Sequence, residues 1–250
     1  MPIGRSRRAG VTRAVGAGLL LAALALPACT SADGTGDAAG PGATTTLVQG
    51  DGTFPGDYRL RGNNPDGSRY RGTLTIDGAE DGALALDWDT NGSYEGVGVA
   101  ADGVLAATHG NDGDPCNAAL YPIAPTGRLE GRWVGYDGSG PNTEAAAAVI
   151  PGPPGVAGSY AIEGVSGDGT EYSGSMDIVA SGAAFEVVRQ VGGFLSRGSA
   201  MLIGEDHLAV GFGAENCAVV AYRMRPDGHL AGKWGAEGVQ TPGREEATPD

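Results

Sequence analysis

The chain has 250 residues, of which 46 are glycines and only 18% are charged. Acidic residues outnumber basic residues by 30 to 16, which gives a formal net charge of −14. Nucleic acids bind proteins through concentrated positive charge, so this composition argues against a nucleic-acid partner.

The first 28 residues have the pattern of an export signal. Four arginines precede a short apolar run, and no acidic residue occurs before Asp33. The run is shorter than the roughly 20 residues that a membrane-spanning helix needs. It ends in the letters LPAC at residues 26–29, which resemble the lipobox of bacterial lipoproteins. The resemblance implies cleavage before Cys29 and lipidation of that cysteine, whereas ordinary secretion would leave Cys29 within the signal.

Residues 29–53 follow as a segment with few side chains to bury. They are mostly Gly, Ala, Thr and Asp, a composition typical of flexible tethers. We therefore expect an N-terminal lipid to attach the chain to a membrane of the bacterial cell envelope. The folded part would then lie on the extracytoplasmic side, in the periplasm or at the cell surface.

The rest of the chain contains one sequence module twice. Residues 56–76 and 158–178 share the pattern G-x-Y…G…DG…Y-x-G, with a constant offset of 102 positions. Further along, the pattern C…Y…G-x-L-x-G-x-W recurs with an offset of 101, as between Trp133 and Trp234. Such self-similarity indicates that one structural unit occurs twice.

The modules are expected to span residues 54–145 and 156–247, with a semi-stiff Pro/Gly linker over residues 146–155. Short runs in each module alternate apolar and polar residues, and turn residues recur between them. No amphipathic helix pattern is found. The candidate strands of the first module lie near residues 57–62, 68–76, 83–89, 93–100, 104–108, 116–123, 128–136 and 143–149.

These patterns predict an all-β fold of two tandem small antiparallel meander barrels, each with about eight strands, because closing a meander removes exposed strand edges. Two β-sandwiches are the alternative. Aromatic residues that occur in both modules are expected to fill the two cores. The pairs are Tyr58/Tyr160, Tyr70/Tyr172, Tyr121/Tyr222 and Trp133/Trp234. The repeat resembles one in uncharacterised exported bacterial proteins, some of them labelled fibronectin-binding, which implies adhesion and supplies no catalytic residue.

Cys116 and Cys217 occupy equivalent positions, each at the start of an apolar run. Two alternatives follow from this placement. Each cysteine is a buried thiol within its own module, or the pair forms a disulfide that joins the modules, which an exported compartment permits.

No metal site, cofactor or catalytic residue is predicted. Residues 87–92 begin like a calcium loop, but Gly98 stands where that motif requires a glutamate. His109, Asp112 and Asp114 would mark an envelope hydrolase only if they converged in a deep pocket of the first module.

One predicted hairpin occurs in both modules, with opposite charge in the two copies. The residues concerned are Arg59, Arg61, Arg69 and Arg71 in the first module, and Glu163, Glu171 and Asp177 in the second. Pairing across a turn at residues 63–67 would set Arg61 opposite Arg69, and Arg59 opposite Arg71. Like charges placed directly opposite each other cost up to ~1 kcal/mol per pair.

The same register would set Glu163 opposite Glu171 in the second module. Three interpretations are open. The faces are simply solvated; or the arginine face docks on the acidic face, within one chain or between chains; or the arginines bind an acidic ligand. Arginine suits that last role because its planar group pairs well with carboxylates and sulfates. The ligand would be an anionic polysaccharide or a protein partner.

The sequence as a whole predicts an envelope-anchored lipoprotein that acts as a non-enzymatic binding or interaction protein through two β modules. The alternatives are a purely structural or spacer lipoprotein, and the envelope hydrolase. A binding protein should carry an arginine or aromatic patch in one module only, at residues 59–71, Trp88, Tyr94 or Tyr136. A spacer should have both modules filled by side chains.

Overall fold

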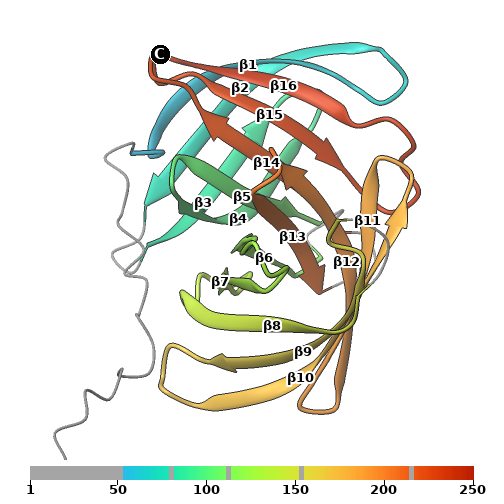
Figure 1. Ribbon diagram of the computed structural model, residues 1–250. Helices are drawn as coiled ribbons and strands as arrows, with labels where there is room; N and C mark the ends of the chain where they lie inside the picture. Colours follow the sequence, from blue (N-terminus) through green and yellow to red (C-terminus); the bar gives the residue numbers. More distant parts are fainter. Residues whose placement is uncertain (1–52, 79–81, 111–113, 152–154, 214–216) are drawn as a thin grey trace, which may run out of the picture. The chain divides into compact units, whose positions relative to one another are not determined.

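The computed structural model describes residues 53–78, 82–110, 114–151, 155–213 and 217–250 (Figure 1). These residues form sixteen β-strands and no helix, which confirms the predicted all-β class. No helix in the described residues could therefore cross a membrane.

The strands of the first half begin and end within two residues of the predicted bounds. They are β1 (Gly56–Asn63), β2 (Arg69–Gly78), β3 (Ala83–Asp89), β4 (Ser93–Ala101), β5 (Val104–His109), β6 (Cys116–Pro122), β7 (Leu129–Val134) and β8 (Asn142–Pro151). In β1 and β2 the apolar residues face inward and the arginines outward, as the alternation predicts.

The second half repeats this series of eight strands. They are β9 (Gly158–Val165), β10 (Glu171–Ser181), β11 (Ala184–Val191), β12 (Phe194–Ile203), β13 (His207–Gly213), β14 (Ala218–Met224), β15 (Leu230–Gly235) and β16 (Gly243–Pro249).

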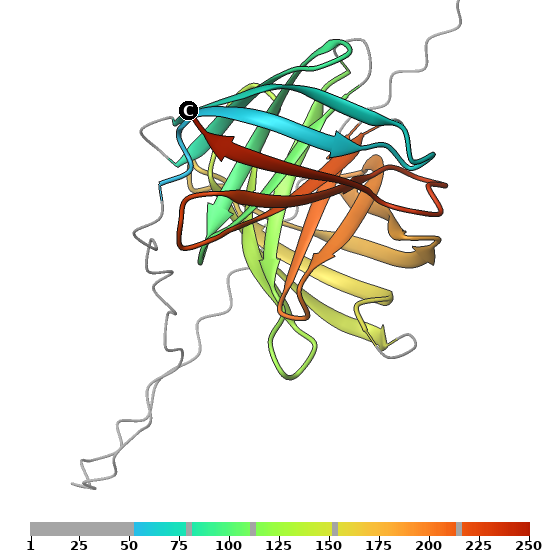
Figure 2. The same cartoon turned by 90° about the horizontal axis from the view of Figure 1, so that it is seen from above.

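The sixteen strands close into two antiparallel barrels of eight strands each. Barrel 1 has the order β1-β16-β15-β14-β5-β4-β3-β2, and barrel 2 has the order β10-β11-β12-β13-β6-β7-β8-β9. The last strand, β16, closes barrel 1 beside the first strand, β1 (Figure 2). The prediction of two small barrels is confirmed, and the sandwich alternative is wrong.

Each barrel takes strands from both sequence modules. Barrel 1 combines β1–β5 with β14–β16, while barrel 2 combines β6–β8 with β9–β13 (Figure 1). Strand β14 pairs with β5, so that Tyr222 lies opposite Leu105, and β6 pairs with β13, so that Tyr121 lies opposite Leu208. The expectation that each module forms a self-contained barrel is therefore wrong. The modules exchange their last three strands.

The expected linker is in part a strand. β8 continues through Ala146 to Pro151, and it pairs with β9 so that Ala146 lies opposite Ile162. Ala146 and Ile162 are both buried in barrel 2. Residues 146–151 therefore belong to the barrel wall, where their hydrogen bonds to β9 hold the two modules together.

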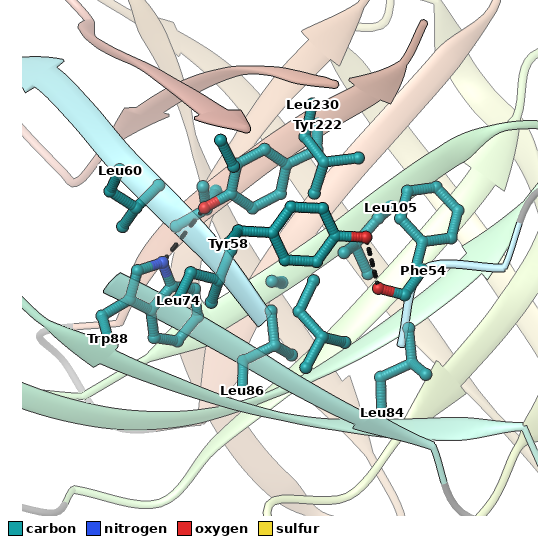
Figure 3. Close-up of a cluster of buried hydrophobic side chains, with 14 residues drawn as sticks. Phe54, Tyr58, Leu60, Leu74, Leu84, Leu86, Trp88, Leu105, Tyr222 and Leu230 are labelled. Atoms are coloured by element: carbon teal, nitrogen blue, oxygen red, sulfur yellow. Dashed lines mark hydrogen bonds between the residues drawn. The ribbon is translucent and has the colours of Figure 1, made fainter. Parts of the chain in front are cut away.

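Apolar side chains fill the middle of barrel 1 (Figure 3). Tyr58 is buried there, and its hydroxyl donates a hydrogen bond of 2.8 Å to the carbonyl oxygen of Phe54. Tyr160 does the same in barrel 2 with the carbonyl of Val156, at 2.7 Å. Of the other repeated aromatic residues, Tyr121 and Tyr222 are fully buried, while the remaining four are partly buried. The recurring rings therefore line the barrels, as predicted.

A further apolar cluster contains residues of both barrels. It joins Val99 and Val219 of barrel 1 to Leu120, Met201 and Ala209 of barrel 2, and all five are buried. These residues belong to the central strands β4, β6, β12, β13 and β14. The outer surfaces of the two barrels thus pack directly on one another.

Cys116 and Cys217 form a disulfide with a Cα–Cα distance of 5.7 Å. Cys116 begins β6, and Cys217 directly precedes β14. These are the two points at which the chain passes from one barrel to the other. The disulfide alternative is thus correct, and the free buried thiols are not found.

Candidate ligand-binding site

A pocket of about 400 Å³ opens at one end of barrel 1. Its wall includes residues from seven strands and from the β1–β2, β3–β4 and β15–β16 turns. The aromatic and acidic ones are Tyr70, Trp88, Tyr94, His109, Trp234 and Glu245. Farther into the core, Phe54 and Tyr58 pack on the side away from Trp88 (Figure 3). Barrel 1 is therefore filled in its middle and hollow at one end.

Glu245 is the acidic group of this pocket. Alternation along β16 turns Gly243, Glu245 and Ala247 inward, and Glu245 is only 5% exposed. Its Oε2 accepts a hydrogen bond of 2.7 Å from the hydroxyl of Tyr70, and its Oε1 accepts one from Tyr222. Two tyrosine hydroxyls therefore hold the carboxyl group in place.

The tyrosine of β2 reaches Glu245 because a glycine on β1 leaves it room. A Cβ atom on Gly62 would lie only 2.1 Å from the Tyr70 ring, far closer than side-chain atoms can approach. Gly164 stands in the same relation to Tyr172 in barrel 2, at 2.2 Å. The repeated glycine thus fixes the place of the repeated tyrosine.

Two indole groups fix the direction of these hydrogen bonds. Nε1 of Trp234 donates to the Tyr70 hydroxyl at 3.1 Å, and Nε1 of Trp88 donates to the Tyr222 hydroxyl at 3.0 Å (Figure 3 shows the second). An indole N–H is only a donor, so each tyrosine oxygen accepts a hydrogen bond from it and donates one through its own O–H to Glu245. Burial and the adjacent Glu245 charge raise the pKa of both tyrosines, which keeps their hydroxyls protonated.

The carboxyl group of Glu245 has no positive partner among the described side chains. Burial raises its pKa, and the hydrogen bonds from Tyr222, Tyr70 and Trp88 oppose this shift without cancelling it. A buried carboxylate without a counter-ion is costly. The pocket therefore contains a buried carboxyl group that no cationic side chain of the described residues compensates.

The wall around this carboxyl group is aromatic. The His109 ring lies 5.6 Å from the Trp88 ring and 5.0 Å from the Tyr94 ring, measured between ring centroids. Burial lowers the pKa of His109, so its ring is neutral at physiological pH. Tyr94 is 38% exposed and brings this wall out to the solvent. The three rings can therefore pack against an apolar or cationic ligand.

Barrel 2 contains the same arrangement around Glu144, which is 3% exposed. The hydroxyl of Tyr121 donates to Oε1 of Glu144 at 2.5 Å, and that of Tyr172 donates to Oε2 at 2.9 Å. Nε1 of Trp133 donates in turn to Tyr172 at 2.6 Å. The exchange of strands brings these groups together from both modules, as it does in barrel 1.

One difference between the two copies concerns an inward position of β3 and β11. Trp88 on β3 lies opposite Tyr94 of β4, and the corresponding residue on β11 is Arg189, opposite Ser196 of β12. Arg189 is 4% exposed. Its Nη2 donates to Oε2 of Glu144 and forms an ion pair with it. Barrel 2 therefore neutralises its buried acid with its own arginine.

Aromatic packing accompanies this arginine. The guanidinium carbon of Arg189 lies 4.0 Å from the centroid of the Phe212 ring. Phe212 pairs with Asn117 of β6, as His109 pairs with Ala218 of β14, so the two rings hold equivalent places. The aromatic contact of barrel 2 thus corresponds to the His109 wall of the pocket.

A second difference leaves barrel 1 open at the same end. In barrel 2 the buried Asn142 accepts a hydrogen bond of 2.7 Å from the backbone N–H of Gly167, in the β9–β10 turn. The matching residues of barrel 1 are Gly243 and Pro65, which lack the side-chain acceptor and the N–H donor, respectively. The β1–β2 turn is therefore not tied across the end of barrel 1.

The arginine hairpin lies outside this pocket, and its register differs from the prediction. Arg61 lies opposite Arg71, Asn63 opposite Arg69, and Arg59 opposite Thr73. The turn occupies residues 64–68, where the N–H groups of Asn64 and Gly67 are hydrogen bonded to Ser68 and Asn64. This turn begins one residue later than predicted, which moves the register by two positions.

Acidic residues next to the hairpin relieve its positive charge. Arg59 forms an ion pair of 2.8 Å with Asp250, and Arg61 lies opposite Glu246 of β16. Strand β16 comes from the second module. The prediction of repulsion between the arginines considered only the hairpin and did not include this strand. Neither of the two expected arginine pairs forms, and a different pair of like charges, Arg61 and Arg71, lies directly opposite.

The acidic hairpin belongs to barrel 2 and has no directly opposed acids. Glu163 lies opposite Ser173, and Glu171 lies opposite Val165. Asp177 lies opposite Ser159 and accepts a hydrogen bond of 2.5 Å from its hydroxyl. No ion pair among the described residues joins the arginine hairpin to this face. The structure therefore gives no support to docking of the two faces within one chain, and docking and binding of an acidic ligand stay predictions.

Among the residues predicted to mark a ligand patch or a hydrolase site, three line the pocket: Trp88, Tyr94 and His109. Asp114 and Tyr136 are not among its lining residues, and Tyr136 is exposed on the turn after β7. Asp112 and Cys29 lie outside the described residues. His109 and Asp114 therefore do not meet in this pocket, as a hydrolase site would require.

Sequence reasoning missed Glu245, Glu144 and Arg189. A signal for them was present, because Glu144 and Glu245 recur at the offset of 101 and occupy an inward position of an alternating strand. The same offset relates Trp88 to Arg189. A repeated acid facing a position that is basic in one copy only would have pointed to the pocket.

Comparison of the chain with models of protein families, with curated proteins and with solved structures finds no match.

Proposed function

We propose that this protein is a non-enzymatic binding protein that takes up a small organic ligand in the pocket of barrel 1. Barrel 2 serves as its closed structural counterpart. The observation that carries the proposal is the difference between two otherwise matching sites. In one of them Arg189 is buried and paired with the acid, while the other has a pocket of about 400 Å³ with an unpaired buried acid and aromatic walls.

General features of ligand sites support this reading. Barrels of eight strands are just wide enough to be filled by side chains or to hold one small ligand. Pockets for small molecules typically measure about 300–1,000 Å³ and combine apolar walls with a few polar groups. Here the rings of Trp88, Tyr94 and His109 supply the walls, and Glu245 supplies the polar group.

The N-terminal sequence supports a location for this activity. Its resemblance to a lipoprotein signal favours attachment through lipid at Cys29, on the extracytoplasmic side of the bacterial cell envelope. A tether over residues 29–53 would then hold the barrels away from the membrane. In that position the pocket would meet solutes of the envelope or of the surrounding medium.

A ligand screen tests the proposal. A set of neutral, cationic and anionic small molecules is added to the purified chain, and binding is followed by native mass spectrometry. The same set is added to the Trp88→Arg variant, which places in barrel 1 the residue that barrel 2 already accommodates at the equivalent position. We expect ligands that bind the natural chain and are lost in the variant.

Two results would count against the proposal. Ligands that bind both proteins equally lie outside the pocket. If no compound binds the natural chain, the alternative of a structural or spacer lipoprotein is favoured. Circular dichroism of the Trp88→Arg variant shows whether it keeps the fold, which this comparison requires.

A further inference from the structure

The two buried glutamates differ in what their oxygens accept. Oε2 of Glu144 accepts hydrogen bonds from both Tyr172 and Arg189. In barrel 1, Oε2 of Glu245 accepts from Tyr70, and Trp88, at the position of Arg189, offers an uncharged N–H group in place of a guanidinium group. Each carboxylate oxygen can accept more than one hydrogen bond. Glu245 therefore lacks a charged donor at the place where barrel 2 has a guanidinium group.

The charge of the pocket points the same way. Trp88, which replaces the arginine, is uncharged, and its N–H group donates to Tyr222. Both tyrosines donate to the carboxyl group, and these hydrogen bonds favour its ionised form while burial opposes it. A ligand with a positive group would supply the missing counter-ion and would gain a charge-assisted hydrogen bond.

The wall of the pocket suits a flat cation as well. In barrel 2 the guanidinium group of Arg189 lies over the Phe212 ring, and the equivalent ring in the pocket is His109, flanked by Trp88 and Tyr94. A guanidinium group is planar and weakly hydrated, stacks on aromatic faces and pairs with carboxylates. Since the pocket is much larger than this group alone, the ligand would also have an apolar body.

On these grounds, and resting on the proposed function, we infer that the ligand carries a guanidinium group, which binds Glu245 as the side chain of Arg189 binds Glu144. In this view the Arg189 guanidinium group holds, in barrel 2, the place that the ligand's guanidinium group would hold in barrel 1. Barrel 2 retains the group as part of its own chain, and barrel 1 accepts it from solution.

Three probes of similar shape test the inference on the full chain by isothermal titration calorimetry. They are benzylguanidine, the neutral benzylurea, and benzylamine, whose charged ammonium group is not planar. We expect benzylguanidine to bind about tenfold or more tightly than benzylurea, because the urea has no charge to pair with the buried acid. Benzylamine should bind less tightly than benzylguanidine.

Two variants assign the preference to its cause. Glu245→Gln, which keeps the size of the side chain, should bring benzylguanidine and benzylurea to within about threefold of each other. Glu95→Gln is a matched control, because Glu95 lies on β4 and is exposed. It should leave the preference unchanged. Circular dichroism verifies that both variants are folded.

The outcomes separate the inference from the proposed function. Equal binding of benzylurea and benzylguanidine, or a preference that survives Glu245→Gln, overturns the guanidinium assignment. Equal binding of benzylamine overturns it too and leaves a site for cations in general. If none of the three binds while the screen yields other ligands lost in Trp88→Arg, this inference fails and the proposed function stands. If the screen yields none, both fail.

Discussion

At the scale of single residues, the two barrels treat the same buried acid in opposite ways. Glu144 is held by two tyrosines and neutralised by Arg189, while Glu245 is held by two tyrosines and left without a cation. Keeping a buried charge without a partner works against folding, so such a group is often a sign of function. The contrast within one chain gives each site an internal reference.

Removing the cation of barrel 2 should be strongly destabilising. Arg189→Met leaves Glu144 buried and unpaired, and we expect the free energy of unfolding to fall by about 3–5 kcal/mol. Adding Glu144→Gln to the same chain should recover a large part of this loss, since no unpaired charge remains. Urea unfolding followed by tryptophan fluorescence measures both. A double variant as unstable as Arg189→Met would show that the loss comes from packing alone.

The acid of barrel 1 should make stability depend on pH. Burial raises the pKa of Glu245 above its ordinary value of 4.5. The folded chain then binds the proton more tightly than the unfolded chain does, so this group favours folding most below about pH 4.5 and less as pH rises through its folded pKa. The groups around it are Tyr70, Tyr222 and Trp88, with neutral His109 in the same pocket.

The Glu245→Gln variant isolates this contribution. Relative to the variant, the natural chain should be most stable near about pH 4 and should lose that advantage toward about pH 8. Urea unfolding of both proteins across this range gives the difference directly. A difference that stays constant with pH would mean that Glu245 titrates no differently in the folded and unfolded chains.

At the scale of strands, alternation and turn residues were enough to locate each element of the first half. They could not show which strands pair across the molecule. The two modules carry the same pattern, so β6 fits beside β13 as well as beside β5, and local sequence does not distinguish these partners. The pocket was missed for a related reason, because Glu245 stands beside Glu246 in a segment that reads as a charged surface strand.

The exchanged strands should keep the two halves together without a peptide bond between them. A protease site inserted at residues 152–154 allows the chain to be cut between β8 and β9. Because both barrels contain strands of both halves, we expect the cut chain to elute as one species in size-exclusion chromatography, even after the disulfide is reduced. Separation of the halves under native reducing conditions would contradict the exchanged topology.

At the scale of the whole molecule, the disulfide joins the two places where the chain crosses between barrels. Cys116 and Cys217 are 101 positions apart, so the bond closes a long loop in the unfolded chain. The apolar cluster between the barrels is buried around these crossings. Bond and cluster therefore both act to keep the barrels packed together.

Loss of this disulfide should lower stability without changing the fold. For Cys116→Ser/Cys217→Ser we expect the free energy of unfolding to fall by about 2–4 kcal/mol. The natural chain should show a similar loss when a reductant is added, and the variant should not respond to the reductant. Urea unfolding in both conditions measures this. An unchanged midpoint on reduction would mean that the bond contributes nothing to stability.

The central claim is that barrel 1 binds a ligand where barrel 2 is closed by its own arginine. The three tryptophans report on it directly, since Trp88 and Trp234 line the pocket and Trp133 occupies the matching place in barrel 2. The most direct measurement is a titration with benzylguanidine that follows the three indole N–H signals by NMR. We predict that the signals of Trp88 and Trp234 shift and saturate while that of Trp133 stays in place. Equal shifts of all three, or no shift with benzylguanidine or with any compound of the screen, would contradict the account.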